Sequence, residues 1–204
     1  MASRLLYLVR HAASDPDPAD PINGGTLNDL GMAQAAALGE RLASVAFDGL
    51  YHSTALPAVE TADILAFSLA NIPRYGDDLL RECVPTRPRD EVLTPAQIEY
   101  FNLLPEDVIE RGAQQAELAL DRYGEVFDRD RVDLLVGHGN LINHFVARAL
   151  DAPPHGWLRP VDYHCGLTVI RYHDRLPPRV LCVNDTGHLS AERRGTEYPA
   201  DLRY

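Results

Sequence analysis

Two short, nearly continuous apolar runs, at residues 5–9 (LLYLV) and 131–136 (RVDLLV), most constrain the fold of this chain. Runs of this kind are typical of strands in a parallel sheet, because helices cover both faces of such a sheet. Each run ends two residues before a histidine, His11 or His138. Since ligands of open α/β sheets bind beyond the carboxyl ends of the strands, both histidines are predicted to lie at one crevice.

Strand-like and helix-like segments alternate along the rest of the chain. Asn28 is a helix-capping residue, and the apolar residues after it recur at helical spacing as far as Val45. The other expected elements are a strand at 47–52, helices near 55–70, within 105–127 and at 140–150, an irregular proline-rich segment at 80–95, and strands at 166–172 and 179–184. This alternation predicts an α/β fold of three layers, with a mainly parallel central sheet flanked by helices. Because no repeat or linker divides the sequence, residues 1–204 are expected to form a single domain.

Composition and charge limit the class of partner. The chain has 204 residues, of which 46% are apolar and 24% charged, so it is long and apolar enough to bury a large core. Its formal net charge is −11 and its isoelectric point is about 5.1. This charge disfavours binding to nucleic acid or to an anionic membrane, and an anionic ligand would need positive charge gathered locally. No sequence pattern indicates an oligomeric state.

The cysteines and the N-terminal segment lead to an expected location. The three cysteines, Cys83, Cys165 and Cys182, match no zinc or redox spacing, so free thiols in a reducing cytosol are expected. No apolar run reaches the length of a membrane span, and the apolar part of the N-terminal segment is too short for a signal peptide. These features predict a cytoplasmic protein that does not associate with membranes.

Polar residues stand where the sheet is expected to open. His11 follows Arg10 at the end of the first strand, and the turn at 137–140 (GHGN) places His138 between two glycines before a helix. Glycines allow the backbone to approach a ligand closely, and a helix N-terminus favours an anion. Glu82 opens the proline-rich segment. Taken singly, each of these features also has a structural explanation, as a strand end, a tight turn or a solvated glutamate.

Together these features resemble the histidine phosphatase superfamily, whose members have a phosphoglycerate-mutase-like fold. The stretches that carry the resemblance follow the family's order and cover most of the chain: LYLVRHAAS (6–14), TLNDLGMAQAAALGERLA (26–43), HSTALPAVETADILA (52–66), LLRECVP (79–85), LLVGHGNLINHFVARAL (134–150) and VNDTGHL (183–189). Within the superfamily, the run HFVARALDAPPHGWLRP (144–160), joined with LLRECVP, is most similar to the branch that contains the mitochondrial serine/threonine protein phosphatase.

The resemblance implies a phosphomonoester hydrolase. His11 would take the phosphoryl group as a phosphohistidine, and Glu82 would be the general acid. Arg10 and His138 would bind phosphate oxygens, and Gly139 would let the backbone approach the substrate. No metal or cofactor is implied, and the substrate would be a phosphorylated small molecule or a phosphoprotein. The alternative enzyme is a phosphoglycerate-mutase-type phosphotransferase, although a compact acidic chain favours hydrolysis.

One position departs from the family pattern. The family carries a second arginine at the start of the helix after the second strand, and Pro57 stands there. Proline fits a first helical turn, but it removes a charged contact worth roughly 1.5–3 kcal/mol. Arg87 and Arg89 follow Glu82 and are the expected replacements in binding the substrate. The remaining hypotheses are a substrate that brings its own positive charge, and a catalytically weak phosphate-binding or interaction domain.

Overall fold

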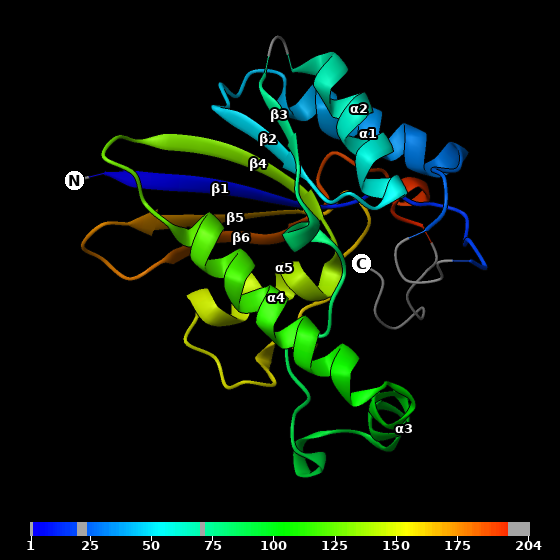
Figure 1. Ribbon diagram of the computed structural model, residues 1–204. Helices are drawn as coiled ribbons and strands as arrows, with labels where there is room; N and C mark the ends of the chain where they lie inside the picture. The colour runs from blue at the N-terminus through cyan, green and yellow to red at the C-terminus, as the bar shows by residue number, and fades with distance from the viewer. Residues whose placement is uncertain (1, 20–23, 70–71, 196–204) are drawn as a thin grey trace.

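The computed structural model describes residues 2–19, 24–69 and 72–195, in which strands and helices alternate (Figure 1). The strands are β1 (Ser3–Arg10), β2 (Gly49–His52), β3 (Arg74–Gly76), β4 (Arg131–Gly137), β5 (Leu167–His173) and β6 (Arg179–Asp185). The α-helices are α1 (Asp29–Leu42), α2 (Leu56–Ser68), α3 (Pro95–Leu103), α4 (Glu106–Gly124) and α5 (Gly139–Ala149). Short 3₁₀ helices lie at Asp78–Leu80, Asp90–Val92, Gly156–Leu158 and Glu192–Arg194.

A six-stranded sheet in the order β3-β2-β4-β1-β5-β6 forms the centre of the fold. β3, β2, β4 and β1 pair in parallel, whereas β5 pairs antiparallel with both β1 and β6. The predicted mainly parallel sheet is therefore confirmed, with an antiparallel portion at one side. Arg10 lies opposite Gly137 in the β1–β4 pair, so these two strands end level. His11 and His138 consequently follow neighbouring strand ends.

Two elements were not expected from the sequence. β3 has only three residues and pairs with β2 along the edge of the sheet. In α3 only Phe101 is buried, so the helix lacks an apolar stripe, and its start is set by a capping box between Thr94 and Gln97. Neither element has the hydrophobic period on which sequence interpretation depends. The cap predicted for the first helix is confirmed, because the Asn28 side chain accepts a hydrogen bond from Gly31 N at 3.0 Å.

Helices cover both faces of the sheet, and Figure 1 shows α1 and α2 on one face and α4 and α5 on the other. The core under α1 and α2 includes Val9, Ala35, Leu38, Leu50, Ala58, Leu65, Leu134 and Val136. The core under α4 and α5 includes Leu6, Leu8, Ala116, Tyr123, Leu135, Phe145 and Ile170. Neighbouring residues of one strand therefore enter different cores, because successive side chains point to opposite faces. This explains why the strands are apolar at nearly every position.

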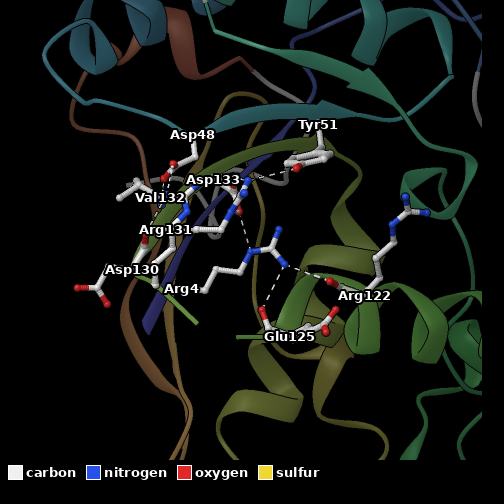
Figure 2. Close-up of polar contacts among 10 residues, drawn as sticks. Arg4, Asp48, Tyr51, Arg122, Glu125, Asp130, Arg131, Val132 and Asp133 are labelled. Carbon is white, nitrogen blue, oxygen red and sulfur yellow. Dashed lines mark hydrogen bonds and ion pairs between the residues drawn. The ribbon is translucent and has the colours of Figure 1, made fainter. Parts of the chain in front are cut away.

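A buried charged network joins β1 and β4 at the end of the sheet opposite the histidines (Figure 2). Asp133 accepts hydrogen bonds from Arg4 Nε and from Arg131 Nη2, both at 2.7 Å. Arg4 also donates through Nη1 to the carbonyl oxygen of Arg122 on α4, at 3.1 Å. The side chains of Arg4 and Asp133 are 3% and 0% exposed. The network therefore connects two central strands to a helix, and the Arg4–Asp133 pair at its centre is shielded from water.

The cysteines are free, as expected, and Cys83 and Cys165 are buried. Within the described parts of the chain, no helix combines the length and the apolar character needed to cross a bilayer.

Candidate active site

His11 lies directly beyond β1, in a single tautomer. Its backbone N–H donates to the carbonyl oxygen of Gly137 at 2.9 Å, which extends the pairing of β1 with β4. Its ring Nδ1 lies 2.8 Å from the carbonyl oxygen of Ala12. Because a carbonyl oxygen only accepts, Nδ1 carries the proton and Nε2 keeps its lone pair. This is the form of the ring that a nucleophile at Nε2 requires.

The surroundings of His11 keep its ring uncharged. Burial lowers the pKa of His11 well below its usual value of 6.5, and positive charge on His138, Arg10 and His164 lowers it further. The ring is therefore neutral at physiological pH, with its lone pair available to an electrophile.

His138 is the single residue between β4 and α5, where it is the N-terminal cap of the helix. The residue is 1% exposed, and the His138 and His11 ring centroids are 5.0 Å apart. Its Nε2 lies 3.0 Å from Ser53 Oγ, in the turn after β2. The first N–H groups of α5 point out of the helix at this place and favour an anion. The turn after β4 thus brings an imidazole and a helix N-terminus to His11.

Glu82 is held over the ends of the strands by its own segment. The side-chain amide of Gln115 on α4 donates to the carbonyl oxygens of Leu79 and Arg81, at 3.2 and 2.7 Å. The segment also packs closely on β4, because a Cβ atom added to Gly137 would lie 3.3 Å from the Leu80 carbonyl oxygen. These contacts place a carboxyl group from a proline-rich loop beside the start of α5.

The carboxyl group of Glu82 is partly buried and accepts hydrogen bonds from the backbone. Oε1 accepts from Cys83 N at 3.1 Å, and Oε2 accepts from Asn140 N at 3.4 Å. Burial raises the pKa of Glu82 from 4.5 to about 7, although the backbone hydrogen bonds and Arg10 act in the opposite direction. A carboxyl group with this pKa is about half protonated near neutral pH, so it can both give up a proton and take one back.

Arg10 is positioned by the segment before β5. Its Nη1 donates to the carbonyl oxygen of Asp162 at 2.6 Å. A Cβ atom added to Gly139 would lie 3.8 Å from Arg10 Cδ and 3.5 Å from Asp162 Oδ2, so the guanidinium lies beside the first residue of α5. The structure therefore brings Arg10, His11, Glu82, His138 and Gly139 together at one end of the sheet.

His164 also belongs to this group, and the sequence interpretation missed it. Its ring centroid lies 5.2 Å from that of His11, close to the separation of His138 from His11. It reaches the site because β5 runs antiparallel to β1, so the start of β5 meets the end of β1. The signal available in the sequence was a histidine just before a strand, and the direction of that strand is not evident from local pattern.

Pro57 lies buried in the first turn of α2, next to the site. Its carbonyl oxygen accepts a hydrogen bond from Thr61 Oγ1 at 2.6 Å, and the same oxygen of Thr61 accepts from Ala12 N at 3.0 Å. The start of α2 is thus attached to the residue that follows His11. The backbone of residue 57 therefore lies next to the site, but the proline side chain brings no charge.

The two arginines expected to replace the missing charge are not among the residues gathered at His11. Arg87 donates to Asn102 Oδ1 at 3.0 Å, pairs with Asp90 at 2.9 Å and lies over the ring of Phe101. Arg89 is exposed, just before the 3₁₀ helix Asp90–Val92. A role for either residue in binding substrate stays a prediction.

Arg81 is the arginine of this segment that points toward the turn after β2, where its Nη1 donates to Thr54 Oγ1 at 3.3 Å.

Among the described residues, no group of three or more histidine, cysteine or acidic side chains could hold a metal ion.

The α/β sheet and the histidines at two adjacent strand ends are the features that identify the class of this protein. The chain belongs to the histidine phosphatase superfamily (branch 1), whose family model matches residues 6–186. The resemblance seen in the sequence is therefore confirmed over most of the chain.

Among individual relatives, the chain is 34% identical over 202 residues to the mitochondrial serine/threonine-protein phosphatase PGAM5 of Rattus norvegicus. The match covers 94% of this chain but 66% of the rat protein, just under two thirds of its length. Solved structures also share this fold. YhfR of Bacillus stearothermophilus is 26% identical, with a TM-score of 0.67 over 91% of this chain and 98% of that one. A phosphoglycerate mutase of Bacillus anthracis, at 18% identity, superposes with a TM-score of 0.68 over 92% and 95% of the two chains.

These relatives overturn one expectation from the sequence. The predicted cytoplasmic location is contradicted, because the curated relatives are named mitochondrial. The prediction depended on the unpaired cysteines and on the lack of a signal-peptide or membrane-span pattern, and these features do not distinguish the cytoplasm from another reducing compartment.

Proposed function

We propose that this chain is a phosphomonoester hydrolase that works through a phosphohistidine on His11, with Glu82 as general acid. The observation that carries the proposal is the state of His11. Its proton is held on Nδ1 by Ala12, and its pKa is lowered by burial and by neighbouring cations, so Nε2 presents a lone pair. Phosphoryl transfer needs little more from a protein than such a positioned nucleophile and positive charge around the phosphate.

In the first step, Nε2 of His11 attacks phosphorus in line with the ester oxygen. The N–P bond forms as the P–O bond breaks, and Glu82 gives its proton to the departing oxygen. Arg10, His138 and the N-terminus of α5 hold the phosphate oxygens, whose negative charge is spread over the transferring group.

In the second step, a water molecule attacks phosphorus and the N–P bond breaks. Glu82, now ionised, takes a proton from that water, and orthophosphate leaves. A mutase would instead return the phosphoryl group to a bound acceptor. Hydrolysis and the mutase reaction share the first step and differ only in what accepts the phosphoryl group in the second.

The name of the rat relative makes phosphoserine or phosphothreonine of a protein the first substrate class to test. A cavity of about 240 Å³ lies beside Glu82, where the departing group would emerge. Its lining combines apolar side chains, such as Val84 and Val108, with the polar residues Tyr100, Arg111, Gln115 and Asn140. These walls suit a small organic group whose phosphate points toward His11.

The purified protein is expected to hydrolyse p-nitrophenyl phosphate in the presence of a metal chelator, and to carry a trapped phosphoryl group when quenched during turnover. Bonds from phosphorus to imidazole nitrogen survive alkali and break in acid, and esters of serine or threonine behave in the opposite way. Rapid quench with radiolabelled substrate and a stability test in acid and alkali measure this. Label that survives acid rather than alkali would exclude the histidine intermediate. Absence of both hydrolysis and label would favour a phosphate-binding domain without activity.

The rate is also expected to fall as pH rises through about 7. Glu82 must be protonated to serve as the acid, and its pKa of about 7 makes the protonated form decline above that value. His11 must be neutral, and because its pKa lies well below 6.5 it limits the rate only in more acidic solution. A pH profile of kcat/KM, which reports ionisable groups of the free enzyme, measures both limbs.

The variant Glu82→Gln tests whether Glu82 transfers a proton, because glutamine keeps the size of the side chain but has no acidic proton. It should lose the fall above pH 7 and lower kcat by about 10²–10⁴-fold. The loss should be greater with phenyl phosphate than with p-nitrophenyl phosphate, because the latter's departing oxygen needs less protonation. An equal loss with both substrates would assign Glu82 to binding rather than to proton transfer.

A further inference from the structure

The phosphate site proposed above is short of positive charge on one side. Arg10 and His138 supply two cationic side chains and α5 supplies its N-terminus. Pro57 brings none, although the start of α2 is hydrogen-bonded to the residue beside His11. A phosphate dianion in a partly buried site needs a matching set of charged donors, since an unmatched charge is costly to remove from water.

His164 occupies the place beside His11 that mirrors His138. β4 and β5 both pair with β1, one on each side. On the β4 side, His11 N donates to Gly137 O at 2.9 Å, and on the β5 side, Cys165 N donates to Arg10 O at 3.0 Å. The ring centroids of His138 and His164 lie 5.0 and 5.2 Å from that of His11. The nucleophile therefore has an imidazole from each neighbouring strand at almost the same distance.

The backbone around His164 is tightly determined. Tyr163 N donates to the side-chain oxygen of Asn184 at 2.8 Å, and Gly166 N donates to the Tyr163 carbonyl oxygen at 2.8 Å. Cys165 has a φ of 56°, in the left-handed region that few residues adopt without support. A Cβ atom on Gly166 would lie 2.2 Å from the Asn184 side-chain oxygen, so the turn admits only glycine there. The histidine is thus held by a closed turn rather than by a loose loop.

His164 is also the residue of this turn that reaches the surface. Tyr163 and Cys165 on either side are 1% and 0% exposed, whereas His164 is partly exposed. Positive charge on its ring helps to lower the pKa of His11, which places the two rings within electrostatic reach.

We propose that His164 binds the phosphate directly as a second imidazole cation, and that it supplies from the β5 side the positive charge that Pro57 leaves out at α2. This deepens the function proposed above, because it names a substrate-binding residue of the same site. The site would then hold phosphate between histidines of two strands, with the nucleophile between them.

Binding of orthophosphate tests the proposal without turnover, by titration calorimetry. In His164→Asn, a neutral side chain that keeps hydrogen-bonding capacity, the Kd for orthophosphate is expected to rise about 10- to 100-fold. KM for p-nitrophenyl phosphate should rise with it by a similar factor. His155→Asn, at a histidine next to the 3₁₀ helix Gly156–Leu158, is the matched control and should bind as the wild type does. His164→Gln replaces the asparagine variant if that protein does not fold.

The double variant Pro57→Arg/His164→Asn distinguishes charge from packing. A guanidinium restored on α2 should return the Kd to within a few-fold of the wild-type value, whereas a packing defect at the turn before β5 would not be repaired. Wild-type binding by His164→Asn, or no recovery in the double variant, would overturn the proposal. So would a greater loss in Arg81→Ala than in His164→Asn. Phosphate binding that depends on His164 in a protein without hydrolysis would leave this inference standing and remove the proposed function.

Discussion

Replacement of His11 by alanine is expected to lower kcat for p-nitrophenyl phosphate by at least about 10⁴-fold, because it removes the only atom proposed to bond to phosphorus. The trapped phosphoryl label should vanish together with the activity. The rest of the site stays in place, since the backbone N–H of residue 11 still donates to Gly137 O. Orthophosphate should therefore still bind, through Arg10 and the N-terminus of α5.

Two further variants make this result specific. His155→Ala removes a histidine away from the strand ends and should leave kcat unchanged. His138→Ala should lower kcat while the label still forms, since His138 binds phosphate and does not accept it. If His11→Ala retained a tenth or more of the wild-type rate, the phosphohistidine mechanism would be wrong. Label retained in His11→Ala would place the nucleophile elsewhere.

The second large effect concerns stability. Arg4→Met is expected to lower the free energy of unfolding by about 3 kcal/mol, at the lower end of the range for breaking a buried ion pair. The variant leaves Asp133 fully buried, with Arg131 as its remaining charged partner in the network. It also removes a guanidinium that lies 5.6 Å from the ring centroid of Tyr123 on α4. Urea denaturation followed by circular dichroism measures the change.

Two controls separate burial from charge. Arg129→Met breaks the pair of Arg129 with Asp48, where the arginine side chain is 61% exposed, and should change stability by less than about 1 kcal/mol. The double variant Arg4→Met/Asp133→Leu removes the buried carboxylate as well and should recover much of the loss. Equal effects of Arg4→Met and Arg129→Met would contradict the role assigned to burial. A double variant less stable than Arg4→Met would show that Asp133 is needed for reasons other than its charge.

Much of the site was predictable because its parts stand beside strong local signals. The apolar runs before His11 and His138 show that two buried strands end there, and parallel strands end at the same edge of a sheet. Arg10 and Gly139 follow from the same runs. Glu82 was identified through its place in the family's order of motifs, since a glutamate in a loop has no periodic signal. An acid with a raised pKa was expected from the mechanism, but the burial that raises it is not evident in the sequence, because the segment is held by Gln115 of α4, far along the chain.

Other predictions depended on side-chain directions that sequence does not specify. Arg87 was predicted to bind substrate near Pro57, and in the structure its side chain contacts Asp90, Asn102 and Phe101. The contact of Ser53 with His138 requires β2 to lie beside β4. Such contacts join residues distant in the chain, and packing of the whole domain selects among their rotamers.

By itself, the sequence determined the layers of this protein, its family and the identity of the histidine at the end of β1, because local periodicity and the order of motifs encode them. Only the tertiary structure showed that His164 completes the group of side chains around that histidine. β5 runs antiparallel to β1, and this direction alone brings His164 within 5.2 Å of His11. Strand direction depends on the path of the chain through the whole fold, so no short stretch of sequence specifies it.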